Sequence, residues 1–515
     1  MNISRKARTT QALTLGAVLT GVFGIGAGCG GGDTPGTGMN VLVITLDTTR
    51  PDRISCYGGQ PGLTPAIDDI AAQGVRFDRA ISTAGITPMS HSSILTGLNN
   101  YAHGMRVFYS PKVSHQLKEA VDTLPEMLKG FDYATAARVS SYPVSEHYGL
   151  DQGFDDFESG VDLENLDLTK QQSHKTLWDS KGKTHTQRRG DFTTDSALEW
   201  LEANGTEGPW CMWMHMFDVH DYSIVPPDSF MERYGLEYPA PGTRLGMEGK
   251  IQWREAMYDP ELAFMDMQIA RVRAWLKENG QDENTIIVIT ADHGQGLRDG
   301  YERHGWMKHR LLYDWCVRVP LIVRVPGGAS GGTVDAQVRT IDVVPTIMES
   351  LALPMRNPVE GDSLVALMNG GTENTPRVAY ADALNDYDVH APSEQVLPPF
   401  QHDNLFMACD GRWKLIWHES NPERSQLYDL LKDPQELQNL YAPGHDRAKA
   451  LLAYLKDRRA MDVEPPGSGS KAPDVAALKG LGYGGDDEIE DEEPSDKGTD
   501  ARDTDAKDTK STTPK

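Results

Sequence analysis

The sequence lacks an excess of basic residues: its 515 residues include 50 Lys and Arg against 75 Asp and Glu, a formal net charge of −25. A protein that binds a duplex needs basic side chains to neutralise phosphates, so this composition argues against a nucleic-acid partner. The hydrophobic share of 39% and the charged share of 24% exclude a fibre or a wholly disordered chain. The length allows about three domain-sized units, or one large domain and a smaller one.

The sequence also lacks a CxxC pair and any internal repeat, although it contains five cysteines. The spacing of these cysteines excludes a zinc knuckle and a thioredoxin-type redox site. Whether Cys56, Cys211, Cys316 and Cys409 form disulfides is left open by the sequence.

No long hydrophobic run is present, because the apolar stretch from Thr10 to Ile25 is short and rich in Gly and Thr. Basic residues precede this stretch, and small residues followed by Cys29 resemble a bacterial lipoprotein cleavage site. We expect an exported protein of the bacterial cell envelope, attached to the membrane only through a lipid on Cys29. Because Gly26 departs from the lipoprotein pattern, ordinary signal-peptidase cleavage and a periplasmic or secreted protein remain the alternative.

Three continuous apolar runs predict strands that are covered on both faces, as in a parallel sheet: Asn40–Leu46, Trp210–Met216 and Thr285–Thr290. Helical patterns alternate with them, including a helix that Thr64 caps and another from Pro260 to Glu278. The expected fold class is α/β, a large sandwich of a mostly parallel mixed sheet between helices.

Beyond about residue 375 the pattern changes to short strands around an Asp410-Gly411 turn, which predicts a smaller antiparallel α+β subdomain. The acidic end of the chain lacks apolar residues and predicts a disordered tail. The expected organisation is a signal peptide over 1–28, a tether over 29–38, a catalytic domain over 39–375, a C-terminal subdomain over 376–485 and a tail over 486–515.

Polar side chains follow these strands where the strands end: Asp47 after the first run and Asp292-His293 after the third. Ligands of such sheets gather at the carboxyl ends of the strands, so we expect these residues near one edge. Carboxylates with a histidine suit a divalent cation: Ca²⁺, Mg²⁺, Mn²⁺ or Zn²⁺. His215 lies inside an apolar run and is interpreted as a core histidine.

A hydroxyl-rich loop at Thr87 leads into a predicted short helix, whose backbone N–H groups would face an anion. A hydroxyl beside a cation loses its proton readily and becomes a nucleophile. His220, Lys308 and His309 could hold the anion or protonate a leaving group. Together these residues indicate a metal-dependent hydrolase of a tetrahedral oxyanion ester.

Several segments resemble the sulfatases, a branch of the alkaline-phosphatase-like superfamily, from Met39 to about Gly485. These segments include NVLVITLDTTRPDRISCYG, SHSSILTG, HMFDVHDY, TADHGQGLRDGYERHG and QLYDLLKDPQELQNL. The resemblance implies an alkaline-phosphatase-like fold and hydrolysis of a sulfate-type ester in a small molecule or glycan.

Carried over by position, the resemblance puts the nucleophile at Thr87 and a substrate-anion contact at His220. His91 replaces an Arg that stabilises the nucleophile in typical sulfatases. The remaining cationic contact falls on His309 in register, or on Lys308 one residue away. The metal-ligand positions fall on Asp47, Asp292 and His293.

The nucleophile position departs from the family pattern, since sulfatases oxidise Cys or Ser to formylglycine. The methyl group on the Thr87 Cβ allows oxidation only to a ketone, so formylglycine is not expected. Threonine nucleophiles occur in phosphodiesterase relatives, which favours phosphodiester or phosphonate chemistry. One divalent cation is expected, Ca²⁺ or Mg²⁺, or else Zn²⁺ or Mn²⁺ if the protein is phosphodiesterase-like.

Further departures leave alternatives open. Thr48 replaces a common second Asp ligand, and Asp218 with His220 could hold a second metal. The chain could be an inactive surface lipoprotein that binds an anionic glycan or lipid headgroup. A register shift would make Ser90 or Ser92 the modified residue, but the spacing to Leu95-Thr96-Gly97 argues against it.

Overall fold

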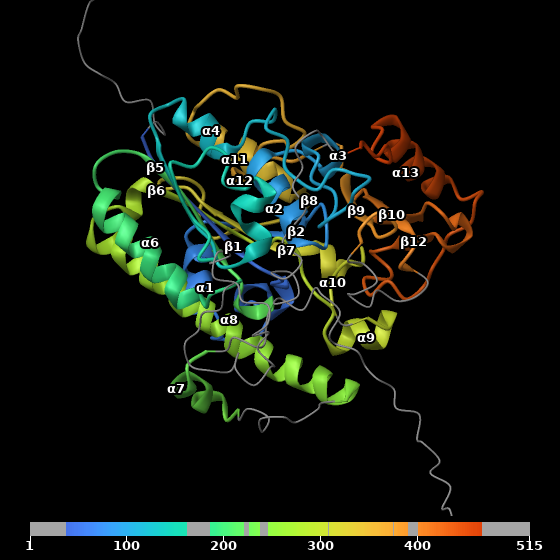
Figure 1. The fold of residues 1–515 in the computed structure, drawn as a ribbon, viewed down its shortest axis with the longest axis horizontal. Coiled ribbons are helices and arrows are strands. Elements are labelled where there is room, and N and C mark those ends of the chain that lie inside the picture. The colour runs from blue at the N-terminus through green and yellow to red at the C-terminus, as the bar shows by residue number, and fades with distance from the viewer. Residues whose placement is uncertain are drawn as a thin grey trace, which may run out of the picture.

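The computed structural model describes residues 38–161, 186–220, 226–236, 246–306, 308–373, 375–389 and 400–465. A large sheet lies between two layers of helices, and a smaller sheet with one helix lies beside it (Figure 1). The predicted signal peptide, the lipidation site Cys29 and the acidic tail lie outside the described residues.

Eight strands form the large sheet: β1 (Asn40–Leu46), β2 (Val75–Ile81), β3 (Ala134–Arg138), β4 (Asp156–Glu158), β5 (Trp210–Met216), β6 (Thr285–Thr290), β7 (Arg318–Arg324) and β8 (Gly332–Arg339). Their order across the sheet is β4-β3-β5-β1-β6-β7-β2-β8. Neighbours are parallel except where β7 pairs with β6 and β2. The predicted mostly parallel mixed sheet is therefore confirmed.

Both faces of this sheet are buried, and alternate residues of β1 point into opposite cores. Val41 and Val43 share one core with α2 (Thr87–Thr96), α4 (Leu124–Lys129), α11 (Val343–Ser350) and α12 (Val365–Met368). Leu42 and Ile44 share the other with α1 (Pro65–Ala72), α6 (Gly190–Asn204) and α8 (Met247–Glu278). The remaining helices of the large unit are short: α3 (Asn100–His103), α7 (Asp228–Met231), α9 (Arg298–His304) and α10 (Asp314–Val317).

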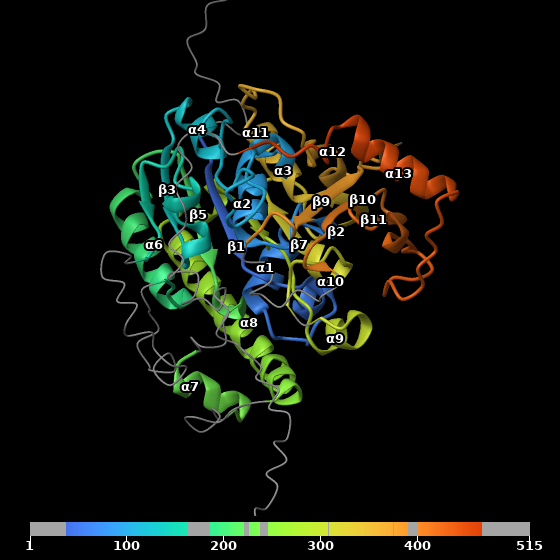
Figure 2. The same ribbon diagram turned by 45° about the vertical axis from the view of Figure 1, so that its right-hand side comes forward.

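The second sheet is antiparallel and contains β9 (Ala379–Leu384), β10 (Asn404–Cys409), β11 (Trp413–His418) and β12 (Gln426–Asp429). One face packs on aromatic and leucine side chains of the large unit, among them Trp306 and Trp315. Helix α13 (Asp446–Asp457) covers the other face, as Figure 2 shows. The antiparallel α+β unit is confirmed, while its boundary at residue 375 stays a prediction.

The prediction that a helix begins at Pro260 was wrong, because α8 begins at Met247 and runs through Pro260. Proline removes a helical hydrogen bond and normally ends a helix. Here tertiary contacts hold the preceding turns: the Tyr258 hydroxyl donates to the Thr48 carbonyl and accepts from the Arg50 N–H, both at 2.8 Å. Local propensity is overridden by contacts with the loop that follows β1.

The N-terminus of α1 is capped by a residue distant in sequence. Thr64 precedes Pro65 as predicted, but its side chain makes no capping bond to the helix. Instead Asp266 of α8 accepts the N–H groups of Ala66 and Ile67 at 3.0 and 2.8 Å. The cap therefore joins two helices that cover the same face of the sheet.

We expect Asp266→Ala to lower the free energy of unfolding by about 1–2 kcal/mol, because the N–H groups of the half-buried Ala66 and the buried Ile67 lose their acceptor. Urea denaturation at neutral pH measures this change. Asp195→Ala, which removes an exposed ion pair with Arg271, is the control and should change stability by less than about 0.5 kcal/mol. Equal midpoints for the two variants would contradict the capping role.

Cys56, Cys211, Cys316 and Cys409 all carry free thiols. Within the described ranges, no helix has both the length and the apolar character that crossing a bilayer requires.

Candidate functional site

Adjacent strands bring Asp47, Asp292 and His293 together at the carboxyl edge of the sheet. Asp47 follows β1, and Asp292 and His293 follow its neighbour β6. All three side chains are fully buried, and one ligand atom of each lies within 4.8 Å of the others. In the part of the chain that the structure describes, no other three His, Cys, Asp or Glu residues converge in this way.

The hydrogen bonds of this cluster orient its three side chains and indicate which of their atoms could bind a cation. The His293 Nδ1 lies 2.9 Å from the Gly294 carbonyl, which can only accept, so Nδ1 carries a hydrogen and a neutral ring would present a lone pair at Nε2. That Nε2 lies 3.2 Å from the Asp292 Oδ2. The buried Asp47 Oδ1 has no hydrogen-bond partner. Two carboxylate oxygens and an imidazole nitrogen fit a divalent cation.

Backbone groups fix the orientation of the Asp292 carboxylate. The N–H groups of Thr48 and His293 donate to its Oδ1 at 3.1 and 2.7 Å. Thr48 makes this bond from φ 51°, a left-handed conformation that a β-branched residue rarely adopts. Where the family resemblance places a second Asp ligand, this chain thus supplies a backbone donor to the neighbouring carboxylate.

Burial and a neighbouring carboxylate both disfavour the charged form of Asp47. Burial and the nearby Asp292 carboxylate raise the pKa of Asp47 well above its usual value, and His293 and Thr87 partly oppose this shift. A bound cation would stabilise both carboxylates in their charged forms.

Thr87 is the first residue of α2, and its hydroxyl faces the cluster. The Thr87 Oγ1 lies 3.4 Å from the His293 Nε2, and the side chain is fully buried. Ile86 provides no side-chain cap, and the helix ends at Gly97 with φ 70°. The N-terminus of α2 therefore opens toward the same centre as the candidate metal ligands.

His91 contacts the backbone of Thr87 as a neutral ring. Its Nδ1 donates to the Thr87 carbonyl at 2.8 Å, and its Nε2 lies 3.0 Å from the Thr45 Oγ1. Because the Trp213 indole donates to that same oxygen at 2.9 Å, the Thr45 hydroxyl hydrogen is free to point at His91. Burial lowers the pKa of His91 to about 3. His91 thus holds Thr87 in place without supplying the positive charge of an arginine.

Two further histidines and two cationic side chains lie beside the cluster. The His309 ring stacks on His293 at 4.8 Å and lies 5.4 Å from His220, measured between centroids. Burial lowers the pKa of both His220 and His309 well below the ordinary value. His293, Arg254 and Lys308 also disfavour a proton on His220, so these three groups act on the same ring.

Sequence reasoning did not place Arg254 or His215 beside the candidate site. Arg254 lies in the part of α8 that precedes Pro260, which was not predicted to be helical. His215 is a buried, hydrogen-bonded core histidine as predicted, and in addition its Nε2 lies 3.2 Å from the Asp47 Oδ2. No local signal could have found either residue, because both are placed by contacts between distant segments.

Asp218 and His220 do not form a second ligand cluster among the described residues. The Asp218 Oδ1 accepts the Gly190 N–H at 2.9 Å, and burial raises its pKa to about 7. Asp218 therefore holds the start of α6 in the described structure.

Helix α2 is tied to the rest of the fold through a buried histidine. The His103 Nδ1 accepts the Met105 N–H at 3.1 Å, and its Nε2 lies 2.9 Å from the Ser93 Oγ on α2. Burial, followed by the charges of Arg106 and Lys118, lowers the pKa of His103 to about 3. The folded protein therefore keeps this ring neutral.

We expect His103 to destabilise the fold in mild acid. Below pH 6.5 the unfolded chain binds a proton that folded His103 binds only near pH 3, so stability falls as pH drops through this window. The slope is up to about 1.4 kcal/mol per pH unit for one histidine. Urea denaturation between pH 7 and 5 should show a shallower loss for His103→Gln than for the wild type; parallel curves would refute the assignment.

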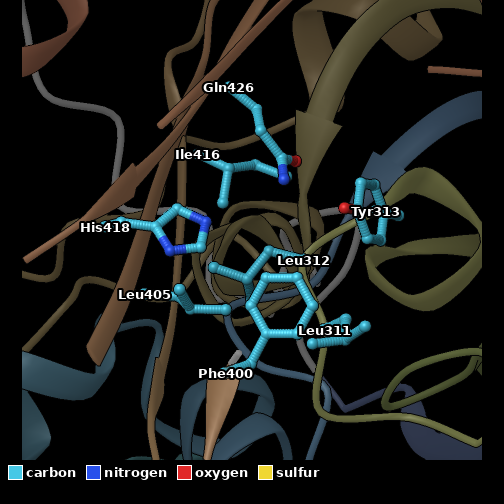
Figure 3. Close-up of a pocket in the computed structure, with 8 residues that line it drawn as sticks. All are labelled: Leu311, Leu312, Tyr313, Phe400, Leu405, Ile416, His418 and Gln426. Carbon is cyan, nitrogen blue, oxygen red and sulfur yellow. The ribbon is translucent and has the colours of Figure 1, made fainter. Parts of the chain in front are cut away.

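A separate small pocket lies against the second sheet, lined by side chains that include Leu312, Phe400 and His418 (Figure 3). None of the candidate metal ligands lines it. The pocket is distinct from the cluster at the edge of the large sheet.

Two protein-family models together match most of the described chain. A family model described as Sulfatase matches residues 39–352, and one described as N-sulphoglucosamine sulphohydrolase, C-terminal, matches residues 302–461. An N-acetylglucosamine-6-O-sulfatase of Bacteroides thetaiotaomicron is 23% identical, over 81% of this chain and 86% of its own. An arylsulfatase of Clostridium perfringens is 24% identical, over 82% of this chain and 94% of its own.

Solved structures share the fold. A protein in complex with its substrate D-glucosamine-2-N,6-O-disulfate superposes with a TM-score of 0.63 at 21% identity, over 82% of this chain and 98% of its own. The phosphonate monoester hydrolase of Agrobacterium radiobacter gives a TM-score of 0.62 at 21% identity, over 82% and 95%.

Proposed function

This chain is an ester hydrolase of the sulfatase family, and on that premise we propose that it cleaves a sulfate- or phosphate-type ester with Thr87 as nucleophile and one divalent cation. The observation that carries the proposal is the position of the Thr87 hydroxyl, 3.4 Å from the His293 Nε2 and beside Asp47. An alcohol held among metal-ligand side chains is suited to attack a charged ester.

Asp47, Asp292 and His293 would hold the cation. When bound, it lowers the pKa of an adjacent hydroxyl and offsets negative charge on the group being transferred. The two carboxylates are oriented for this by backbone and imidazole donors that occupy their other oxygens.

The protein side chains account for the remaining steps of the proposed reaction. The Thr87 Oγ forms a bond to sulfur or phosphorus while the bond to the ester oxygen breaks, and the proton lost by Thr87 balances the one that the alcohol gains. Water then attacks the sulfur or phosphorus of the threonine ester, the bond to the Thr87 oxygen breaks, and one proton of the water restores the Thr87 hydroxyl. The product is sulfate, phosphate, a phosphate monoester or a phosphonate, according to the substrate. Lys308 and Arg254 would bind the anion. His220 and His309 are neutral before substrate binds, but the negative charge of the bound anion favours their protonated forms, so they could then pass a proton to the leaving oxygen.

The test is a substrate panel with metal add-back. Chelator-treated protein is assayed on aryl sulfates, phosphomonoesters, phosphodiesters, phosphonates and 6-O-sulfated N-acetylglucosamine, with Mg²⁺, Ca²⁺, Mn²⁺ or Zn²⁺ restored one at a time. We expect turnover of at least one class that depends on the cation. Turnover that is unaffected by removing and restoring the metal would refute the mechanism, and no turnover of any class would refute the proposed substrate range.

Export with a lipid on Cys29 is a separate part of the proposal. Growth of the expressing bacterium with labelled palmitate should label the wild-type protein and leave Cys29→Ala unlabelled. An unlabelled wild type would contradict the lipid anchor on Cys29. The proposed hydrolase activity would be unaffected by that result.

A further inference from the structure

His215 makes two hydrogen bonds that together assign its hydrogen. It lies near the end of β5 and is fully buried. The backbone N–H of Ser140 donates to its Nδ1 at 3.3 Å, so Nδ1 presents a lone pair. In the neutral ring the hydrogen then lies on Nε2, which donates to the Asp47 Oδ2 at 3.2 Å.

The surroundings of His215 hold this geometry from several sides. The Ser140 hydroxyl donates to the His215 carbonyl at 2.6 Å, which fixes the donor relative to the ring. The ring of His91 meets that of His215 edge-on at 4.9 Å. Phe217 lies on another side, 6.1 Å away between centroids. Rotation of the imidazole would break both hydrogen bonds and these ring contacts.

Asp47 is consequently held by β5 through two groups. Its backbone N–H donates to the Met216 carbonyl at 2.9 Å, and its Oδ2 accepts from His215. Its Oδ1 is buried and has no hydrogen-bond partner. The two oxygens of one carboxylate thus have different roles.

We propose that His215 is a positioning residue for the cation site, and that its Nε2–H holds the Asp47 Oδ2 so that Oδ1 faces the cation. This inference rests on the proposed function, since it assumes that Asp47 is a metal ligand. Donors behind a ligating side chain fix its orientation, and their loss typically weakens metal binding about 10–100-fold.

A purely structural role for His215 predicts a different result. If the ring only fills space in the core, an apolar replacement of similar size should leave cation affinity unchanged. If the N–H matters, a replacement that keeps a donor near the Nε2 position should retain affinity. Gln places an amide N–H close to the position of Nε2, whereas Phe and Met offer no donor.

The experiment measures Mn²⁺ binding to chelator-treated full-length protein by isothermal titration calorimetry, with the thermal midpoint of the metal-free protein as a check on folding. We expect His215→Phe to bind Mn²⁺ about 10–100-fold more weakly than the wild type, and His215→Gln to stay within about threefold. Should His215→Phe fail to fold, His215→Met, which is flexible and apolar, replaces it. His418→Phe removes a buried histidine–aspartate bond in the second sheet and should leave Mn²⁺ affinity unchanged.

Each outcome of this experiment either supports or contradicts the positioning role of His215. Wild-type affinity in a folded Phe or Met variant overturns the positioning role and leaves the proposed function intact. Equal weakening in the Gln variant also overturns it, because the donor is then not what matters. A wild type that binds no Mn²⁺ or other divalent cation refutes the metal site and this inference with it.

Discussion

Thr87→Ala should lower kcat by at least about 10³-fold on any substrate that the wild type turns over, because the attacking oxygen is lost while the cation site remains. The change removes a buried hydroxyl at the first position of α2, where its contact is with the His293 Nε2 at 3.4 Å. Steady-state kinetics on the best substrate of the panel measure this loss. Mn²⁺ affinity should remain within about tenfold of wild type, since the three candidate ligands are untouched.

Two variants make this prediction specific to the hydroxyl. Thr87→Ser retains a primary alcohol and should keep activity within about tenfold of wild type. Thr96→Ala removes another buried hydroxyl of the same helix, which bonds only backbone groups, and should leave kcat unchanged. Full turnover by Thr87→Ala would show that another group attacks the ester and would refute Thr87 as the nucleophile.

Asp292→Asn should lower cation affinity by more than about 100-fold and reduce activity to background. Losses of this size exceed those expected for residues behind the ligands. The amide oxygen can still accept the Thr48 and His293 N–H groups, so the local backbone should survive. The introduced amide nitrogen would donate to the His293 Nε2 and occupy a second ligand atom.

The same substitution has an expected effect on stability that separates loss of metal from loss of fold. Burial raises the pKa of Asp47 most, and repulsion by Asp292 adds to this, so neutralising Asp292 should leave the metal-free protein as stable as wild type or more stable. Calorimetric Mn²⁺ titration and thermal unfolding of metal-free protein provide the two measurements. Asp403→Asn, at a buried aspartate of the second sheet, is the control and should bind Mn²⁺ normally. Wild-type Mn²⁺ affinity in Asp292→Asn would show that Asp292 is not a ligand.

The central strands were predictable because their apolar runs are continuous. Three of these runs coincide with β1, β5 and β6, since a strand buried on both faces needs no polar residue along its length. The helix through Pro260 was not predictable, because bonds from Tyr258 to the loop after β1 compensate for the proline. The cap of α1 was missed for a similar reason, since its acceptor Asp266 is supplied by a distant helix.

Residue chemistry and family pattern alone identified the side chains that the structure gathers around Asp47, Asp292 and Thr87. Only the tertiary structure decided how those groups are oriented, because strand order places β5 beside β1 and so puts His215 behind Asp47. It also decided that His91 is a neutral ring and that the first half of α8 brings Arg254 toward His220. A sequence specifies which donors and acceptors are present, but their hydrogen bonds and pKa values depend on burial and on neighbours that only folding brings together.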